Sequence, residues 1–262
     1  MRIPYYQVDA FTDRVFSGNP AGVCLLESWL PDGTLQQIAL ENNLSETAFV
    51  VRRDDEFDLR WMTPTMEIDL CGHATLAPAF IIFTELGYAG QAIRFNTKTG
   101  PLGATRDGPR IVLDFPSWEA KPCEVPALLA DALGWIPREL YRNRDYLAVL
   151  TSERELLSLK PDMTTLAQLE CLGVICTAPG EDCDFVSRFF APGAGIPEDP
   201  VTGSAHSTLT PYWAKRLGKS KLHARQLSAR RGELWLEDRG ARVGIGGECA
   251  LYSRAEIEVP AV

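Results

Sequence analysis

Two stretches of the sequence follow the same plan at a fixed offset, and this internal repeat constrains the fold more than any other feature. Each stretch begins with a predicted strand, which starts at an aspartate and ends at a proline. A predicted helix follows, and a glycine comes directly after the helix. The strands span residues 58–64 and 184–192, and the helices span residues 72–86 and 203–217. Setting Cys71 against Thr202 aligns four identities without a gap: Gly72 with Gly203, Ala74 with Ala205, Leu86 with Leu217, and Gly87 with Gly218. A duplicated unit of this kind predicts two similar lobes, each a sheet with a central helix of the same length.

Hydrophobic patterning extends this plan over the whole chain. Alternation and short apolar runs predict further strands at 3–11, 21–26, 48–52, 57–62, 111–115, 147–150, 173–176 and 185–190, and helices at 32–42 and 125–133. Pro78 and Pro211 lie inside the two long helices and predict a kink or an early break in each. We place the lobes at 1–116 and 117–262, and we allow for strands exchanged between them near the termini.

Charge and hydropathy exclude several classes of partner. The formal net charge of -9 argues against nucleic acid and against an anionic membrane surface, because both require a basic footprint. The longest nearly apolar run, Ala74 to Phe83, falls far short of the roughly 20 residues that cross a bilayer. Alternation from Ile3 to Phe11 is typical of a strand and not of a signal peptide, so we expect a cytoplasmic protein that acts on a small molecule.

The cysteines and histidines do not form a metal-binding pattern. Seven cysteines without paired short spacings predict reduced thiols, not a disulfide framework. Three histidines with no HExxH or CxxC string predict that no metal is bound.

The two predicted helix starts are candidate anion sites. Gly72 and Gly203 allow close approach to the backbone, and the first turn of a helix offers unpaired N–H groups and a partial positive charge. If both starts face one cleft, they predict a substrate that carries a carboxylate. A plain tight turn at each glycine is the alternative interpretation.

Glu46 is the candidate acid/base, because it enters an apolar strand where burial would raise the pKa of its carboxyl group. Asp199, kept extended by the proline that follows, adds a second carboxylate before the second long helix, and Ser204 adds a hydroxyl. His73 lies where the helix dipole favours a neutral imidazole. Each residue also has an alternative role. Glu46 can lie at a solvated strand end or in an ion pair, Asp199 can be a cap, and His73 can be structural.

Cys71 suggests a different chemistry. A thiol at a helix N-terminus has a depressed pKa and can act as a nucleophile or base. Its duplicated position is Thr202, so the second thiol of a two-thiol racemase is missing.

Four strings together resemble the PhzF family of phenazine biosynthesis-like proteins, and they cover essentially the whole chain: residues 16–21 (FSGNPA), 45–49 (SETAF), 71–75 (CGHAT) and 198–205 (EDPVTGSA). The resemblance implies an α+β protein with two pseudo-symmetric lobes of the diaminopimelate-epimerase fold, each a curved, mostly antiparallel sheet or barrel around a central helix. It also implies a homodimer and no cofactor.

The same resemblance implies residue roles. Glu46 matches the glutamate that moves a proton along a conjugated substrate, and His73 and Asp199 match other catalytic positions. The substrate-binding turns are matched by Gly72, Thr202, Gly203 and Ser204. A proton-moving isomerase is the leading hypothesis. An amino-acid epimerase using Cys71 and a catalytically silent binding or scaffold protein are the alternatives.

Overall fold

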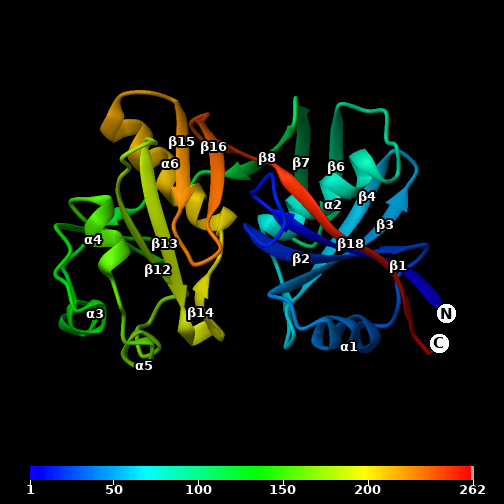
Figure 1. The fold of residues 1–262 in the computed structure, drawn as a ribbon, viewed down its shortest axis with the longest axis horizontal. Coiled ribbons are helices and arrows are strands. Elements are labelled where there is room, and N and C mark those ends of the chain that lie inside the picture. The colour runs from blue at the N-terminus through cyan, green and yellow to red at the C-terminus, as the bar shows by residue number, and fades with distance from the viewer. Residues whose placement is uncertain (261–262) are drawn as a thin grey trace. The chain divides into compact units, whose positions relative to one another are not determined.

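A computed structural model describes residues 1–260, which divide into two compact units (Figure 1). The first contains Met1–Phe115 and the described residues from Ile245 onward, and the second contains Pro116–Gly244. The C-terminal stretch joins the first unit through β18 (Cys249–Glu258), which pairs antiparallel with β1 (Arg2–Ala10) over its whole length. The first unit therefore contains both ends of the described chain.

The first unit is built on one continuous series of paired strands. Its order is β18, β1, β2 (Asn19–Leu26), β3 (Glu46–Arg53), β4 (Glu56–Met62), β6 (Ala92–Thr97), β7 (Gly100–Asp107) and β8 (Arg110–Pro116), with the short β5 (Glu67–Ile68) beside β4. The β2–β3 and β4–β6 pairs are parallel, and the others are antiparallel. Parallel neighbours need a crossover, which α1 (Asp32–Asn42) and α2 (His73–Thr84) provide.

The second unit repeats this pattern of pairings. Its order is β9 (Lys121–Pro122), β10 (Glu139–Arg142), β11 (Tyr146–Val149), β12 (Val174–Pro179), β13 (Phe185–Ala191), β15 (Lys221–Gln226) and β16 (Gly232–Asp238), with β14 (Ile196–Asp199) beside β13. The strands β1, β2, β3, β4, β6 and β7 correspond in order to β10, β11, β12, β13, β15 and β16. In both series the second and fourth pairs are parallel, which in the second unit are β11–β12 and β13–β15. The crossovers are α4 (Glu153–Ser158) with α5 (Met163–Leu166), and α6 (Gly203–Leu217).

The remaining elements are α3 (Ala127–Leu133), the short 3₁₀ helix Pro192–Ala194 and β17 (Arg242–Gly247). The repeat predicted from the aligned glycines is confirmed as a repeat of strand order, strand direction and crossover helix.

The long helix of each unit packs on its sheet and is largely buried. Nearly every side chain of α2 is buried, as expected for a helix that is apolar on all sides, and Trp61 donates from Nε1 to the Ala74 carbonyl at 3.0 Å. In α6, Trp213 stacks on Phe185 of β13 with ring centroids 5.4 Å apart. Such packing fixes the first turn of each helix relative to its sheet.

Two details of the predicted helices are wrong. The helix α6 has the predicted bounds and 15 residues, but α2 has 12 residues and ends at Thr84, so the lengths differ. The cause lies in the last turn, where Leu86 N–H bonds to the Ile81 carbonyl five residues back and the regular pattern stops before Gly87. The sequence predicts a kink or an early break at Pro78 and Pro211. Of these two outcomes the early break does not occur, since both helices continue past their prolines.

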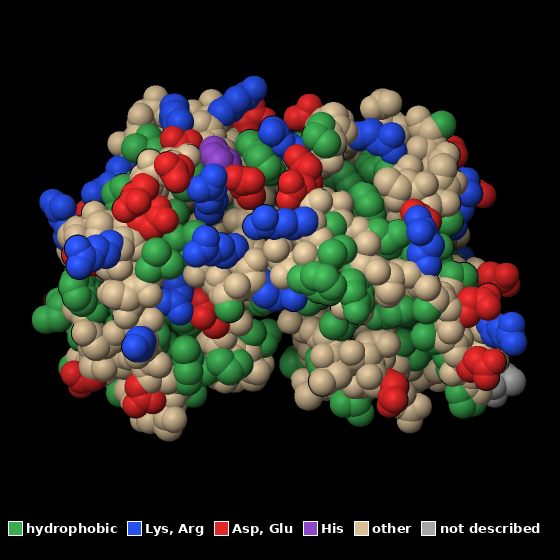
Figure 2. Space-filling model, viewed as in Figure 1, with side chains coloured by type: hydrophobic (Ala, Val, Ile, Leu, Met, Phe, Trp, Pro, Cys, Tyr) green, Lys and Arg blue, Asp and Glu red, His purple; other side chains and the backbone are tan. Residues whose placement is uncertain are grey.

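Figure 2 shows acidic and basic side chains interspersed on the face it draws, so the net negative charge is not gathered there in one patch. Among residues 1–260, no helix has the length and apolar character needed to cross a membrane.

Candidate active site

In the first unit, the start of β3 and the turn into α2 bring Glu46, Cys71 and His73 together. Strands β2 and β3 are parallel and in register at Ala21 and Glu46, so the carboxylate lies at the strand edge where β2 also begins. Gly72 is the N-cap of α2, and its carbonyl accepts from the backbone N–H of Leu76 at 2.9 Å. The turn therefore places His73 as the first helical residue.

His73 is the centre of a buried cluster. Its Nε2 lies 2.9 Å from Oε2 of Glu46, within ion-pair distance, although the ring N–H does not point at the carboxylate closely enough for a hydrogen bond. Its Nδ1 lies 3.1 Å from Nδ2 of Asn19 and 3.5 Å from Sγ of Cys71. The exposed fractions are only 6% for Glu46, 3% for His73 and 6% for Cys71. The imidazole thus separates a carboxylate on one side from an amide and a thiol on the other.

The electrostatics of this cluster overturn two expectations. Burial and the negative charge of Glu46 raise the pKa of the Cys71 thiol, so the helix N-terminus does not produce the expected depressed value. Burial would lower the pKa of His73, but the neighbouring Cys71 and Glu46 raise it well above its usual range. The shift is opposite in direction to the one expected from the helix dipole.

The three side chains also offer metal-ligand atoms. Donor atoms of Glu46, Cys71 and His73 lie within 4.8 Å of one another. However, His73 presents Nε2 to the carboxylate and Nδ1 to the thiol, and one ion binds only one ring nitrogen. A cation bound here would use one ring nitrogen, one carboxylate oxygen and the sulfur.

In the second unit, the predicted residues Asp199, Thr202, Gly203 and Ser204 lie at the start of α6. Thr202 precedes the helix, and its hydroxyl donates to Oδ2 of Asp199. Gln226 closes the turn: its Oε1 accepts from Thr202 N–H at 2.8 Å, and its Nε2 donates to the Asp199 carbonyl at 2.8 Å. The Thr202 carbonyl lies 2.8 Å from Nδ1 of His206. Thr202 therefore uses its hydroxyl, N–H and carbonyl within the turn.

The predicted residues thus form two groups, one in each unit. Glu46, Gly72 and His73 meet in the first, and Asp199, Thr202, Gly203 and Ser204 meet in the second.

Sequence reasoning missed three residues that contact these groups: Asn19 at His73, Gln226 at Thr202, and Arg144, which donates to Oγ of Ser204 at 3.3 Å. Asn19 had a signal, since it lies in the string FSGNPA that carries the family resemblance.

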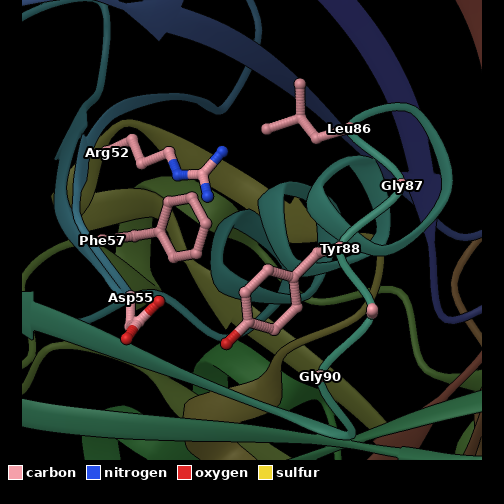
Figure 3. Close-up of a pocket in the computed structure, with 8 residues that line it drawn as sticks. Arg52, Asp55, Phe57, Leu86, Gly87, Tyr88 and Gly90 are labelled. Carbon is pink, nitrogen blue, oxygen red and sulfur yellow. The ribbon is translucent and has the colours of Figure 1, made fainter.

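A surface hollow of about 400 Å³ lies elsewhere in the first unit (Figure 3). Its walls are the β3–β4 turn, with Arg52 and Asp55, and the segment after α2, with Leu86 and Tyr88. No predicted site residue lines it. It offers an open surface with one charged residue of each sign, and it gives no indication of a ligand.

Comparison with known proteins shows which family and which solved structures the chain is similar to. The family model PhzC-PhzF, phenazine biosynthesis-like protein, matches residues 8–255. An uncharacterized isomerase of Pseudomonas aeruginosa is 51% identical over 96% of this chain and 97% of its own. The crystal structure of a phenazine biosynthesis protein of the PhzF family from Enterococcus faecalis superposes with a TM-score of 0.97, at 46% identity over 99% of this chain and 100% of its own.

A more distant structure shares the fold alone. A hydroxyproline epimerase from Agrobacterium vitis has a TM-score of 0.64 at 11% identity, covering 98% of this chain and 92% of its own. The predicted two-lobed, epimerase-like α+β fold is confirmed.

Proposed function

Because this chain belongs to the PhzC-PhzF family of phenazine biosynthesis-like proteins, we propose that it is a cofactor-independent isomerase that moves a proton within a small carboxylate-bearing substrate. Glu46 is the general acid/base. The observation that carries the proposal is the buried Glu46 carboxylate 2.9 Å from the His73 ring at the start of α2.

The reaction we propose is an internal proton transfer. The Glu46 carboxylate takes a proton from one substrate carbon and returns it to another carbon of the same molecule. Atoms and electrons therefore balance without an oxidant or a co-reactant. The His73 ring lies 2.9 Å from the Glu46 carboxylate and can hold it in position for the transfer. The charge that develops on the substrate suits the unpaired N–H groups in the first turn of α2.

Within this proposal, the residues of the second unit recognise the substrate and hold their turn in shape. Ser204 and the backbone of Gly203 are the groups of this turn suited to binding. Thr202 has a supporting role, because its polar atoms are already used by Asp199, Gln226 and His206. Asp199→Asn should weaken both binding and rate, because it alters the charge at this helix start.

A one-thiol epimerase is the second candidate. The contact that favours it is the 3.5 Å approach of the Cys71 sulfur to His73 Nδ1, which provides a path for the thiol proton. Two features oppose it: burial raises the pKa of the thiol, and the equivalent position in the second unit is Thr202. A two-base exchange would therefore have to use Glu46 as its other base.

Glu46→Gln tests the proposal without knowledge of the substrate. The protein is incubated in deuterated water with small molecules extracted from cells, and mass spectrometry follows deuterium incorporation into carboxylates. We expect wild type to label at least one compound and Glu46→Gln to lower the labelling rate by at least about 10²-fold, the lower limit of a positioned acid/base. Glu41→Gln, at an exposed glutamate of α1, is the matched control and should label as wild type does. Labelling by Glu46→Gln within about tenfold of wild type would exclude Glu46 as the acid/base.

A further inference from the structure

The turn between β10 and β11 is anchored to α6. Asn143 donates from Nδ2 to Oγ1 of Thr208 at 2.9 Å and to the Trp118 carbonyl at 3.3 Å. The turn is closed within itself, because the Asp145 N–H donates to Oδ1 of Asn143 at 3.0 Å. Arg144, between these two residues, therefore has a backbone position fixed relative to the helix.

The guanidinium of Arg144 is held on two sides. Its Cζ lies 4.6 Å from the ring centroid of Trp118, a cation–π distance. Its Nη2 donates to Oδ2 of Asp145 at 2.9 Å, and this carboxylate is fully buried whereas the arginine side chain is 37% exposed. Nη2 also donates to Oγ of Ser204 at 3.3 Å. A buried anion and an aromatic ring thus hold a solvent-accessible cation beside the first turn of α6.

The repeat gives this contact a counterpart in the first unit. The β1–β2 and β10–β11 connections are equivalent in strand order, and His73 is equivalent to Ser204 in the aligned duplication. In the first unit, Asn19 at the start of β2 contacts His73. Both units therefore send a polar side chain from this hairpin to the residue that follows the helix glycine, but the side chain is a neutral amide in one and a cation in the other.

We infer that Arg144, together with Ser204, forms a binding site for a small carboxylate within the second unit. Nη1 of Arg144 makes no hydrogen bond to any residue from 1 to 260, and the Ser204 hydroxyl is adjacent. One carboxylate oxygen can accept from Nη1 and the other from the hydroxyl, in the geometry that suits a planar guanidinium. The inference goes beyond the proposed function, because all the contacts that carry it lie within the second unit.

A titration with benzoate, a small planar carboxylate, tests this assignment. The ¹⁵N-labelled protein is titrated into the millimolar range while the Arg144 Nε–H signal, assigned by its loss in Arg144→Lys, is followed by NMR. Benzamide, which has the same shape without the charge, is the matched ligand. We expect benzoate to shift the signal and Arg144→Gln to weaken benzoate binding about 10- to 100-fold, as for a lost hydrogen bond to a charged group, with little effect on benzamide. Arg144→Lys should restore part of the affinity.

Arg142→Gln is the matched control variant. Arg142 belongs to the same hairpin and lies over an aromatic ring, Tyr146, at 4.8 Å, but its Nη2 donates to the Glu170 carbonyl at 2.6 Å. Its replacement should leave benzoate binding unchanged. Because Arg144→Gln leaves Asp145 buried without its cation, the double variant Arg144→Gln with Asp145→Asn removes the pair together and should show the same loss if the single variant folds poorly.

Three results would overturn the assignment: no benzoate shift in wild type, unchanged benzoate affinity in the folded Arg144 variants, or equal affinity for benzoate and benzamide. The proposed function fails by a different result, since it depends on the labelling rate of Glu46→Gln. That variant keeps Arg144 and should bind benzoate as wild type does, so the two failures are distinguishable.

Discussion

Each of the two long helices buries a histidine in its first turns, and the two histidines have opposite electrostatics. His73 of α2 has a raised pKa, since the neighbouring Cys71 and Glu46 outweigh the effect of burial. His206 of α6 is fully buried, and burial lowers its pKa to about 4, only partly offset by the Thr202 carbonyl. The equivalent helices therefore carry a histidine with a raised pKa in one unit and a histidine with a lowered pKa in the other.

The difference follows from a few equivalent positions. Glu46 and Val174 occupy comparable places at the start of a parallel strand, Cys71 matches Thr202, and His73 matches Ser204. In the first unit these positions hold titratable groups. In the second they hold a valine and two hydroxyls, and the turn is closed by hydrogen bonds through Gln226. The two units thus share a scaffold and differ in the side chains at these positions. Three further experiments test this difference.

The largest expected effect concerns the pH dependence of stability through His206. The carbonyl of Thr202 can only accept, so His206 carries its proton on Nδ1. Above pH 6.5 the ring is neutral in both folded and unfolded chains; as pH falls, the unfolded chain takes up a proton that the folded chain refuses until about pH 4. At about 1.4 kcal/mol per pKa unit, this contributes a loss of about 3 kcal/mol in the free energy of unfolding over that range.

Urea unfolding of His206→Asn measures this contribution, because the amide keeps a donor to Thr202 but does not titrate. The variant should lose less stability than wild type between neutral pH and pH 4. Equal slopes for wild type and His206→Asn would show that the second unit does not keep its histidine neutral.

A smaller effect is expected from the amide that contacts His73. Asn19→Leu removes the neighbour of Nδ1 while keeping side-chain volume, so the ring is free to turn away from Glu46. We expect about a 10²-fold lower labelling rate, the cost of a misplaced catalytic group, together with a displaced pH–rate profile. Asn96→Leu, whose amide donates to Glu56 on the same unit, is the control. An unchanged pH profile would assign Asn19 a purely structural role.

The smallest effect is expected at the thiol. Cys71→Ser places in the first unit a hydroxyl like that of Thr202, and it should retain a labelling rate within about tenfold of wild type, less than the contribution of a positioned acid/base. Cys71→Ala distinguishes loss of the hydrogen-bonding group from loss of volume. A fall of several orders of magnitude in the serine variant would favour the one-thiol epimerase over the proposed isomerase.

Long periodic segments made the scaffold predictable, and the aligned glycines predicted the repeat. The bounds of α6 were predictable because Gly218 adopts a left-handed conformation, with φ 68°, directly after the last helical residue. Short elements such as β5 and β9, each of two residues, carry too little periodicity to be detected.

The site was partly predictable for a related reason. Glu46 and His73 interrupt apolar segments and are visible as charged or titratable residues where none is expected. Asn19, Arg144 and Gln226 act through contacts 54, 60 and 24 residues away along the chain, which no local pattern encodes. The raised pKa of Cys71 likewise depends on burial by distant segments rather than on its place at a helix start.

The pairing of β18 with β1 has a consequence for how the chain is made. Arg2 faces Glu258, so the outer strand of the first unit leaves the ribosome only after the whole second unit has been synthesised. Residues 116–244 are continuous and can fold as soon as they emerge, whereas the first unit must wait with one edge of β1 uncovered. The unit that contains Glu46 and His73 is therefore the last to be completed during translation, and a chain truncated before Cys249 would expose that edge to other chains.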